Sequence, residues 1–578
     1  MSDIAALVAD NFDIWTGAIE RKSGAGRGSG GKRVSLYGIE RLRALILDLA
    51  ARGKLLPQDP ADEPAIKLLP GIERERQRRL TAKEIKNSKG PAKPSSEPFD
   101  LPMGWAWLPL WQTGNIFAGN SINAALRSEL EANVEGRPFV ATKDVGYGFD
   151  PIDYHNGLMV NFDDRRFNIA RPNSVFICAE GGSAGRKMAV SDREVAFGNK
   201  LIANEPWPQI EPRYVLCTYL SDFFFDCFSR EMTGIIGGIS RAKFLALPFP
   251  LPPLAEQRRI VAKVDKLMVL CDALERESAD ALAAHQVLVK SLLATLVNSV
   301  DAADLAANWA RLESHFDTLF TTEASIEALK QTFLDLAIRG LLERQLPNEE
   351  TASNLIRRIG NSKRRYKGTD KKREAAFPCP SNWAWVSVQE LLDPNREISY
   401  GVIKMGPEPA VGGVPTLRCS DVKPGFLDLS GVRNVAPEIE EEYIRTRLVG
   451  GEIVINIRGT LGGVSIVPDE LRGHNVAREV AVIPVSSDLS NKYIVYAMLS
   501  PYFWNHILEN LRGIAYKGLN LSILRDLPIP IPPLAEQQRI VAKVDELMAL
   551  SDALKARLAE VAETGRHLAD AIVERAAA

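Results

Sequence analysis

Apolar and polar positions at the end of the chain follow a helical spacing. Apolar or small residues recur at steps of four and three, the heptad spacing of a helix that packs along another helix. These positions are Ile540, Val544, Leu547, Ser551, Leu554, Leu558, Val561, Gly565, Leu568 and Ile572. A weaker copy of the pattern runs through Ile260, Val264, Leu267, Cys271 and Leu274. Both stretches predict long coiled-coil helices, each preceded by a proline pair that ends a strand.

Shorter patterns predict the other elements. Residues 39–52 and 326–339 have the spacing of amphipathic helices, and each stops before a glycine, Gly53 or Gly340. β-Branched runs such as SVFICA, EIVINI and EVAVIPV lie between glycine and asparagine turns and predict strands. Residues 492–511 predict one helix after the second set of strands. The predicted fold class is therefore α/β, with two globular domains joined by long helices.

The chain is one unit of nearly 290 residues written twice. PPLAEQRRIVAKVDKLMVLCDAL, from Pro252, recurs from Pro532 with nineteen of twenty-three positions identical. IERLRALILDLAARG recurs as IEALKQTFLDLAIRG, and FDLPMGWAWL recurs as FPCPSNWAWV. Between these flanks, residues 98–245 and 377–525 keep only scattered landmarks. The flanks therefore do the same job twice, whereas the interiors share a fold and differ in what they contact.

This repeat places the domain boundaries. We expect N-terminal helices with a basic linker (1–97), a first interior domain (98–250), central helices with a second basic linker (251–376), a second interior domain (377–530) and a C-terminal helix (531–578). The duplication predicts a pseudo-two-fold internal repeat. The duplicated Trp105, Trp107, Trp383 and Trp385 are expected to anchor the cores of the two domains.

Composition narrows the class of protein. A length of 578 residues is too long for one core, and 46% apolar with 25% charged residues is ordinary for a soluble protein. No run of eighteen apolar residues predicts a membrane span, and six scattered cysteines without a secretion signal favour a reducing, cytoplasmic setting. The net charge is −2, so any polyanionic partner has to be met by local charge.

Catalytic motifs are missing from the sequence. It contains no phosphate-binding loop, no HExxH metal motif, no GxSxG elbow and no dinucleotide fingerprint. Residues 191–200 hold the residue types of a loose nuclease pattern, but the matching segment of the second copy does not. Two different domains on duplicated helices suit a protein that reads two halves of one extended ligand, such as the half-sites of a DNA duplex.

The chain resembles the specificity subunits of type I restriction–modification systems. The resemblance lies in PLAEQRRIVAKVDKLM and PLAEQQRIVAKVDELM, in IERLRALILDLAARGKLLPQ, in the DLPMGWAW and PSNWAW openings and in the GTLGG turn. It implies a subunit without catalysis of its own, whose two interior domains read a bipartite asymmetric DNA site. We call these domains recognition domain 1 (98–250) and recognition domain 2 (377–530). It also implies antiparallel helices that dock two adenine-methylating modification subunits. Restriction subunits join them, and S-adenosylmethionine, ATP and Mg²⁺ are expected on the partners, with no cofactor or metal on this chain and no membrane contact.

Two alternatives from other classes stay open on the sequence. The first is a self-contained DNA-processing enzyme with unrecognised catalytic residues, and the second is a structural coiled-coil scaffold. The recognition domains are not basic, since residues 98–245 hold fourteen Lys and Arg against seventeen acids. DNA contact therefore depends on a few well-placed side chains.

Candidate DNA-binding residues are polar or basic, and most lie on turns at matched positions of the two copies. In the first copy they are Lys143, Ser183, Arg186, Lys187, Asn199, Lys200, Ser240, Arg241 and Lys243. In the second copy they are Lys404, Arg418, Ser420, Arg458, Thr460, Arg478, Lys517 and Asn520. Hydrogen bonds at strand ends are the alternative role for these side chains.

Candidate partner-docking residues lie at the duplicated helix start. They are Glu256, Gln257 and Arg259 in the first copy, and Glu536, Gln537 and Arg539 in the second. Helix capping is the alternative role for the glutamates. The basic linkers, 73–96 and 357–373, also sit at matched positions and are candidates for loose phosphate contact.

Overall fold

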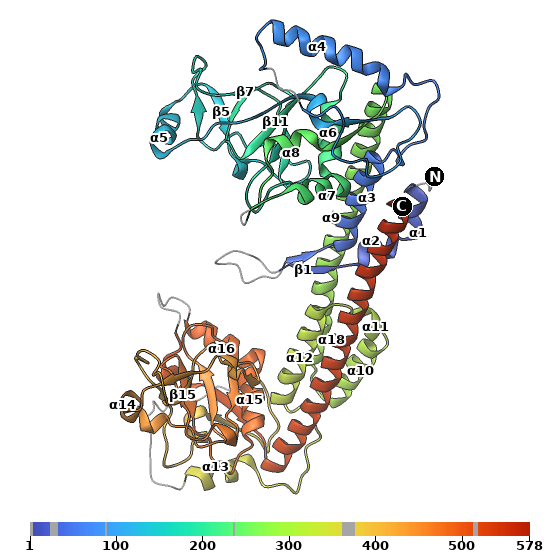
Figure 1. Cartoon of the computed structure of the whole chain (residues 1–578). Coiled ribbons are helices and arrows are strands. Elements are labelled where there is room, and N and C mark those ends of the chain that lie inside the picture. The colour runs from blue at the N-terminus through green and yellow to red at the C-terminus, as the bar shows by residue number, and fades with distance from the viewer. Residues whose placement is uncertain are drawn as a thin grey trace. The chain divides into compact units, whose positions relative to one another are not determined.

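A computed structural model describes residues 4–22, 33–86, 90–234, 237–360, 376–511 and 518–577. Its contacts divide the chain into unit 1, residues 1–280 with 561–578, and unit 2, residues 281–560. The two longest helices, α9 (Leu254–Val297) and α18 (Leu534–Ala577), have 44 residues each and belong in part to both units (Figure 1). The predicted domain boundaries follow the sequence repeat, whereas the boundaries between unit 1 and unit 2 lie within these helices.

Unit 1 begins with helices that precede recognition domain 1. They and a short hairpin are α1 (Ile4–Asp10), α2 (Phe12–Gly17), β1 (Glu20–Lys22), β2 (Arg33–Ser35), α3 (Tyr37–Ala51) and α4 (Leu69–Thr81). The strands of the domain are β3 (Ala106–Pro109), β4 (Gly114–Ala118), β5 (Arg137–Val140), β6 (Met159–Val160), β7 (Ile169–Ala170), β8 (Val175–Cys178), β9 (Met188–Val190), β10 (Val195–Phe197), β11 (Leu201–Pro206) and β12 (Pro248–Leu251). Its helices are α5 (Ala124–Ala132), α6 (Pro212–Leu220), α7 (Asp222–Glu231) and α8 (Arg241–Ala246).

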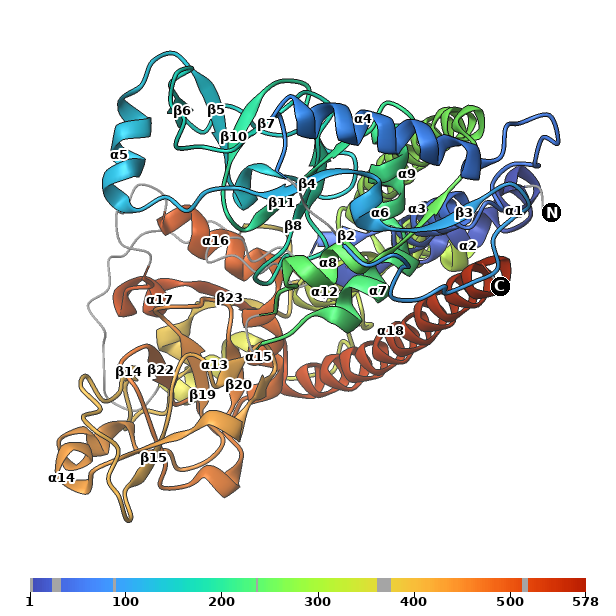
Figure 2. The same ribbon diagram turned by 45° about the horizontal axis from the view of Figure 1, so that its top comes forward.

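Unit 2 repeats this plan. Its helices are α10 (Ala302–Glu313), α11 (Phe316–Leu319), α12 (Glu323–Ile338), α13 (Ala352–Gly360), α14 (Pro437–Glu440), α15 (Asn491–Leu499), α16 (Pro501–Leu511) and α17 (Leu521–Asp526). Its strands are β13 (Ala384–Ser387), β14 (Ser399–Tyr400), β15 (Val414–Leu417), β16 (Val422–Lys423), β17 (Phe426–Leu427), β18 (Arg433–Val435), β19 (Ile453–Asn456), β20 (Val464–Ile466), β21 (Asn475–Val476), β22 (Val480–Ile483) and β23 (Pro528–Ile531) (Figure 2).

The two recognition domains share one sheet plan. An antiparallel sheet has the order β4-β11-β8-β9 in the first domain and β14-β22-β19-β20 in the second. Beside it, β5 pairs with β10 and β15 pairs with β21, and both pairs are parallel. Separate cores fill them, around Phe176 and Phe197 in the first and around Ile455 and Tyr493 in the second. The predicted α/β class and internal repeat are therefore confirmed.

A proline-containing ribbon closes each recognition domain. In the first domain, β12 pairs antiparallel with β3, and Pro248 and Pro250 lie opposite Pro109 and Trp107. Leu110 N donates to Leu247 O, and hydrogen-bonded pairs alternate along such a ribbon, so both prolines of β12 fall at positions whose N–H would point away from β3. In the second domain β13 and β23 repeat the pairing, with Ala384 opposite Ile531.

The predicted helix ends are also found. α3 and α12 are followed by Gly53 and Gly340, whose φ values of +68° and +71° lie in the left-handed region that favours glycine. The single helix predicted over 492–511 is wrong. It is broken at Ser500, which is extended (φ −66°, ψ 150°) and precedes Pro501, a residue that cannot continue the hydrogen bonding of a preceding helix.

The predicted heptad seam is correct only in part. Val561 and Leu568 are 67% and 47% exposed, whereas Ala569 and Val573 are buried. A straight helix has 3.6 residues per turn, so a strict 3.5-residue pattern drifts off the packed face. Of the described helices, α9 alone has the length and apolar composition that could cross a membrane, with a mean hydropathy of 1.3 over its most apolar window. A single helix of this kind is weak evidence for a membrane.

Candidate functional site

Four loops meet at one end of recognition domain 1. We call residues 142–147, 179–187, 198–200 and 237–243 loop cluster 1. Ala179 N donates to Lys200 O (2.8 Å), and Ile239 N donates to Ala179 O (3.0 Å). Lys187 Nζ reaches Thr142 O at 3.2 Å. The structure therefore brings the four predicted segments of the first copy together, although they are up to about 100 residues apart in sequence.

Cationic side chains surround loop cluster 1. Lys143, Arg186, Asn199 and Lys200 are exposed, whereas Ser183 and Lys187 are half-buried. The Arg186 guanidinium lies 5.0 Å from the centre of the Phe225 ring, and Lys187 Nζ lies 5.2 Å from that of Tyr147. Tyr147, which is 56% exposed, escaped the sequence prediction. Its signal was an aromatic residue between two glycines.

The remaining candidates of the first copy make bonds within the domain. Ser240 caps the N-terminus of α8 by accepting from Lys243 N (3.4 Å), and Arg241 donates to Ile116 O (2.9 Å). Lys243 forms an ion pair with Glu231 at 3.0 Å. All three side chains are exposed, so contact with DNA by them stays a prediction that competes with these bonds.

Recognition domain 2 forms a matching cluster. We call residues 402–404, 418–422, 457–463, 477–479 and 519–520 loop cluster 2. Asn456 Nδ2 donates to Cys419 O (3.0 Å) and Thr460 O (3.1 Å), Arg478 N donates to Val402 O (2.9 Å), and Leu519 N donates to Ile457 O (2.8 Å). The described candidates of the second copy therefore also converge.

Loop cluster 2 carries a different set of side chains. Lys404, Ser420, Thr460, Arg478 and Asn520 are exposed, and Arg418 and Arg458 are half-buried. The Arg418 side chain donates to Gly431 O, Ser420 Oγ donates to Asp421 Oδ1 (2.7 Å), and Asn520 caps α17. Lys517 lies outside the described residues. The two clusters therefore share a backbone frame and differ in the groups that they present.

A buried carboxylate holds the same turn in both clusters. Asp144 Oδ2 accepts from Ala141 N (2.8 Å), and Asp421 Oδ2 accepts from Arg418 N (2.8 Å). The two aspartates are 6% and 3% exposed. Their identity in the two copies follows from this structural role, whereas the neighbouring exposed side chains are able to differ.

The duplicated helix start forms a polar socket in each unit. Glu256 accepts a hydrogen bond from Trp105 Nε1 (2.9 Å) at 1% exposure. Glu536 is fully buried and accepts from Trp383 Nε1 (3.1 Å) and Gln345 Nε2 (3.0 Å). We call these two sites the tryptophan sockets. Each fixes a recognition domain to the first turn of α9 or α18.

The adjacent glutamine completes each socket. Gln257 Oε1 accepts from Glu211 N (2.8 Å), and its Nε2 donates to Pro252 O (3.0 Å). Gln537 makes the same bonds to Ser490 N (2.9 Å) and Pro532 O (2.9 Å). Both amides are therefore satisfied inside the protein.

These bonds correct the docking prediction for four residues. Glu256, Gln257, Glu536 and Gln537 are at most 1% exposed and are bonded within their own units, so their side chains have no surface to offer a partner. Their repetition follows from holding a recognition domain twice.

The arginines one turn further along each helix remain partly exposed. Arg259 is 40% exposed and pairs with Asp62, and Arg539 is 30% exposed and pairs with Glu349. For these two, docking stays a prediction. Asp62 and Glu349 each lie nine residues after the glycine that ends the short helix, a repeat signal that the sequence prediction missed.

Burial raises the pKa of both socket glutamates, against the lowering effect of the tryptophan and glutamine hydrogen bonds. A folded state with the higher pKa binds protons more tightly than the unfolded chain, so the unfolding free energy should fall as pH rises through the folded pKa. We expect a Glu256→Gln/Glu536→Gln variant to lose this part of the pH dependence. Urea unfolding of both proteins between about pH 4 and pH 8 measures the difference. If the unfolding free energies of the two proteins changed with pH in parallel, the raised pKa of the socket glutamates would be contradicted.

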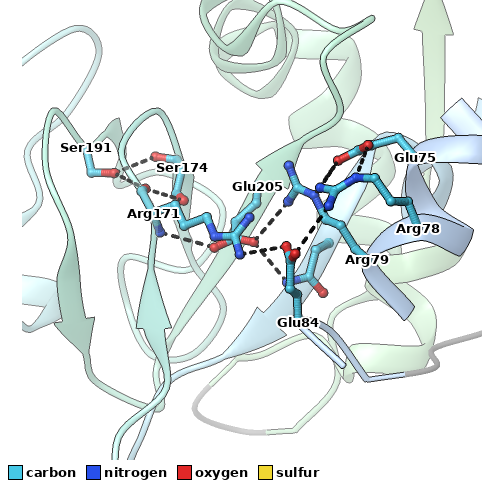
Figure 3. A network of polar contacts seen from close by, with 9 residues as sticks. Glu75, Arg78, Arg79, Glu84, Arg171, Ser174, Ser191 and Glu205 are labelled. Atoms are coloured by element: carbon cyan, nitrogen blue, oxygen red, sulfur yellow. Dashed lines mark hydrogen bonds and ion pairs between the residues drawn. The ribbon is translucent and has the colours of Figure 1, made fainter. Parts of the chain in front are cut away.

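Part of the first basic linker pairs with acids of unit 1 (Figure 3). Its first part is helix α4, where Arg78 and Arg79 pair with Glu75 at 2.8 Å and hold the pKa of that carboxyl down at about 2.

This helix is held against recognition domain 1. Arg79 also lies 3.8 Å from the buried Glu205 of β11, and Glu84 pairs with Arg171 at 3.0 Å. The prediction of loose phosphate contact is therefore wrong for Arg79, whose side chain is 12% exposed and paired with acids of its own unit. For Arg78, which is 56% exposed, it stays a prediction that competes with these ion pairs. Residues 87–89 and 361–373 lie outside the described residues.

The sequence pattern of one family covers both recognition domains. The family described as "Type I restriction modification DNA specificity domain" matches residues 112–284 and 400–563, more than half of the chain. Two Escherichia coli proteins, the EcoEI and EcoAI type I restriction enzyme specificity subunits, are each 33% identical, with 99% of both chains covered in each comparison.

The chain belongs to the type I restriction–modification specificity subunits. Two solved structures are more distant in sequence. The HsdS subunit of Thermoanaerobacter tengcongensis is 19% identical, with a TM-score of 0.35 over 83% of this chain and 98% of that chain. A chain from a study of complex assembly in the type I R-M system is 18% identical, with a TM-score of 0.45 over 83% and 99%. The assignment of this specificity subunit therefore rests on its sequence relatives.

Proposed function

We propose that each recognition domain binds one half of a bipartite, asymmetric DNA site through its loop cluster. The observation that carries this proposal is the contrast within the repeat: one backbone frame occurs twice, while the exposed side chains on it differ. Two copies of one backbone frame would contact DNA in the same way. Because their exposed side chains differ, each copy would select a different half-site. Arginine and lysine beside glycine turns can approach base edges and phosphates closely.

In this proposal the chain performs no catalysis. Two modification subunits dock on the duplicated helices and methylate adenine, and restriction subunits join them to act on the DNA. S-adenosylmethionine, ATP and Mg²⁺ then bind to these partners, and the complex works in the cytoplasm. The partly exposed side chains of Arg259 and Arg539, at matched positions of α9 and α18, support docking of one partner twice.

Reconstitution tests this function directly. The purified chain, incubated with S-adenosylmethionine or Mg²⁺ and DNA, is expected neither to methylate nor to cleave. Addition of the modification subunits should produce methylated adenines, and sequencing of these positions should yield one two-part motif. Methyl transfer by the chain alone, or a motif without two parts, would reject the proposal.

Exchange of one recognition domain should change half of that motif. Ala384 and Ile531 face each other across the β13–β23 ribbon, so the domain enters and leaves its unit at adjacent backbone positions. Replacing residues 384–531 by the equivalent segment of a relative with another motif should alter one half-site and leave the other intact. Mapping of methylated adenines measures the outcome, and the reciprocal exchange of residues 106–251 is the control. A change in both halves would contradict independent recognition.

A further inference from the structure

A groove lies between the end of α9 and α12 in unit 2. Its volume is about 420 Å³, and most of its lining is apolar. Ala294, Ala324 and Ala328 line it together with the buried Val289 and Leu293. Three alanines on two facing helices leave space where longer side chains would otherwise meet.

Lys290 lies on the lining of the same groove. Its side chain is exposed and makes no ion pair or hydrogen bond with any part of the chain that the structure describes. The groove therefore combines an apolar floor with an exposed lysine that has no ion pair among the described residues.

The first copy shows what fills this place. Along the repeat, Tyr37 and Arg41 of α3 correspond to Ala324 and Ala328, and Asp570 of α18 corresponds to Lys290. In unit 1, Tyr37 Oη donates to Asp570 Oδ1 at 2.8 Å, and Arg41 Nε lies 2.8 Å from the same oxygen. An aromatic ring and a guanidinium therefore lie over the helix pair in unit 1.

The second copy has changed the whole set. Arg41 also pairs with Asp222 at 3.4 Å, and the residue that corresponds to Asp222 is Pro501. The aromatic ring, the guanidinium and both of its acids are absent together, and one acid is replaced by a base. A loss of packing alone would not require this reversal of charge.

The chemistry of the groove restricts its ligand. The alanine floor favours an apolar or aromatic side chain. Lys290 favours a carboxylate beside it. A nucleic-acid backbone fits poorly, because one cation cannot balance several phosphates and Asp335 lies at the lining of the same groove.

We propose that this groove receives a segment of a modification subunit, which places an aromatic side chain over Ala324 and Ala328 and a carboxylate on Lys290. This inference rests on the proposed function. Because unit 1 fills the corresponding place with its own Tyr37 and Arg41, the contact forms once per chain. The two modification subunits are then held unequally, and the one on unit 2 gains an additional contact.

Copying the first set into the second tests the proposal. The variant Ala324→Tyr/Ala328→Arg/Lys290→Asp should fill the groove from within. Titration of the full-length chain with the modification subunit, followed by native mass spectrometry and calorimetry, resolves two binding steps. We expect one step to weaken at least about tenfold and the other to stay unchanged. Two unchanged steps would overturn the proposal.

Two further variants separate the causes. Lys290→Asp alone reverses only the charge and should weaken the same step, and it covers the case in which the triple variant does not fold. Arg311→Asp makes the same change of charge on an exposed part of α10 outside the groove and should have no effect. An equal effect of Arg311→Asp would overturn the assignment.

Other results identify other failures. If the unchanged chain binds no modification subunit, the proposed function itself fails. If the triple variant binds both subunits normally but changes its own sedimentation, a second copy of the chain is the occupant and the proposal is wrong.

Discussion

Replacing Lys143, Arg186, Lys187 and Lys200 together by alanine should weaken specific DNA binding about a thousandfold. Three of these side chains are exposed, and all four residues belong to loop cluster 1. One contact of a Lys or Arg with DNA contributes roughly 1 kcal/mol or more, so four losses amount to about 4 kcal/mol. The magnitude of the slope of log binding constant against log salt concentration should also fall by about 3 to 4, because fewer counterions are released from the DNA.

Fluorescence anisotropy of the reconstituted complex on its mapped target, at several salt concentrations, measures both effects. A control variant in which Arg127, Arg165, Arg193 and Arg230 become alanine removes the same charge from exposed positions of recognition domain 1 outside the cluster. It should change affinity far less. Equal losses in both variants would show that net charge, rather than the loop cluster, governs binding.

Substitution of Glu536 by alanine should destabilise unit 2 by about 2 to 4 kcal/mol. The change removes the acceptor of Trp383 Nε1 and Gln345 Nε2, and it also removes a 3.4 Å contact from Asn382 Nδ2. These donors lie in a buried or half-buried site, so their desolvation would no longer be compensated. Glu256→Ala should have a comparable effect on unit 1 through Trp105.

Hydrogen exchange of the full chain, followed separately for peptides of the two units, resolves the effect on each unit. Glu536→Gln keeps an acceptor for the tryptophan and should cost less than Glu536→Ala. Glu546→Ala removes an exposed carboxylate of the same helix and should change stability by no more than about 0.5 kcal/mol. A loss after Glu546→Ala as large as after Glu536→Ala would argue against the tryptophan socket.

The repeat made most of the fold predictable. Spacing along the chain located α3, α12, α9 and α18 because a buried face has to recur at the helical period. The break at Ser500 was missed, because the apolar periodicity continues across it and hid the proline signal. The short strands within each domain pair across long separations, and no local pattern in the sequence specifies those partners.

The functional residues were less predictable than the fold. Turn position and charge selected loops that the structure brings together, although the sequence did not predict their convergence. Side-chain partners were not readable: Arg418 turns back to Gly431, and Arg79 pairs with acids of its own unit. The strict repetition of Glu256 and Glu536 favoured a role in partner docking. In the structure it is explained by the buried indole N–H groups of Trp105 and Trp383, which donate to these carboxylates.

The prolines of β12 and β23 bear on how a chain that contains the same segment twice avoids mispairing. The outward edge of β12 lacks the N–H groups of Pro248 and Pro250, and Pro250 O already accepts from Tyr214 Oη at 3.0 Å. Pro530 O is likewise bonded to Tyr493 Oη at 2.8 Å. A finished ribbon therefore offers little to a third strand, whether from the other copy or from a neighbouring molecule. Two copies of the same ribbon can then be synthesised in one polypeptide with little risk of mixed sheets or strand-exchanged aggregates.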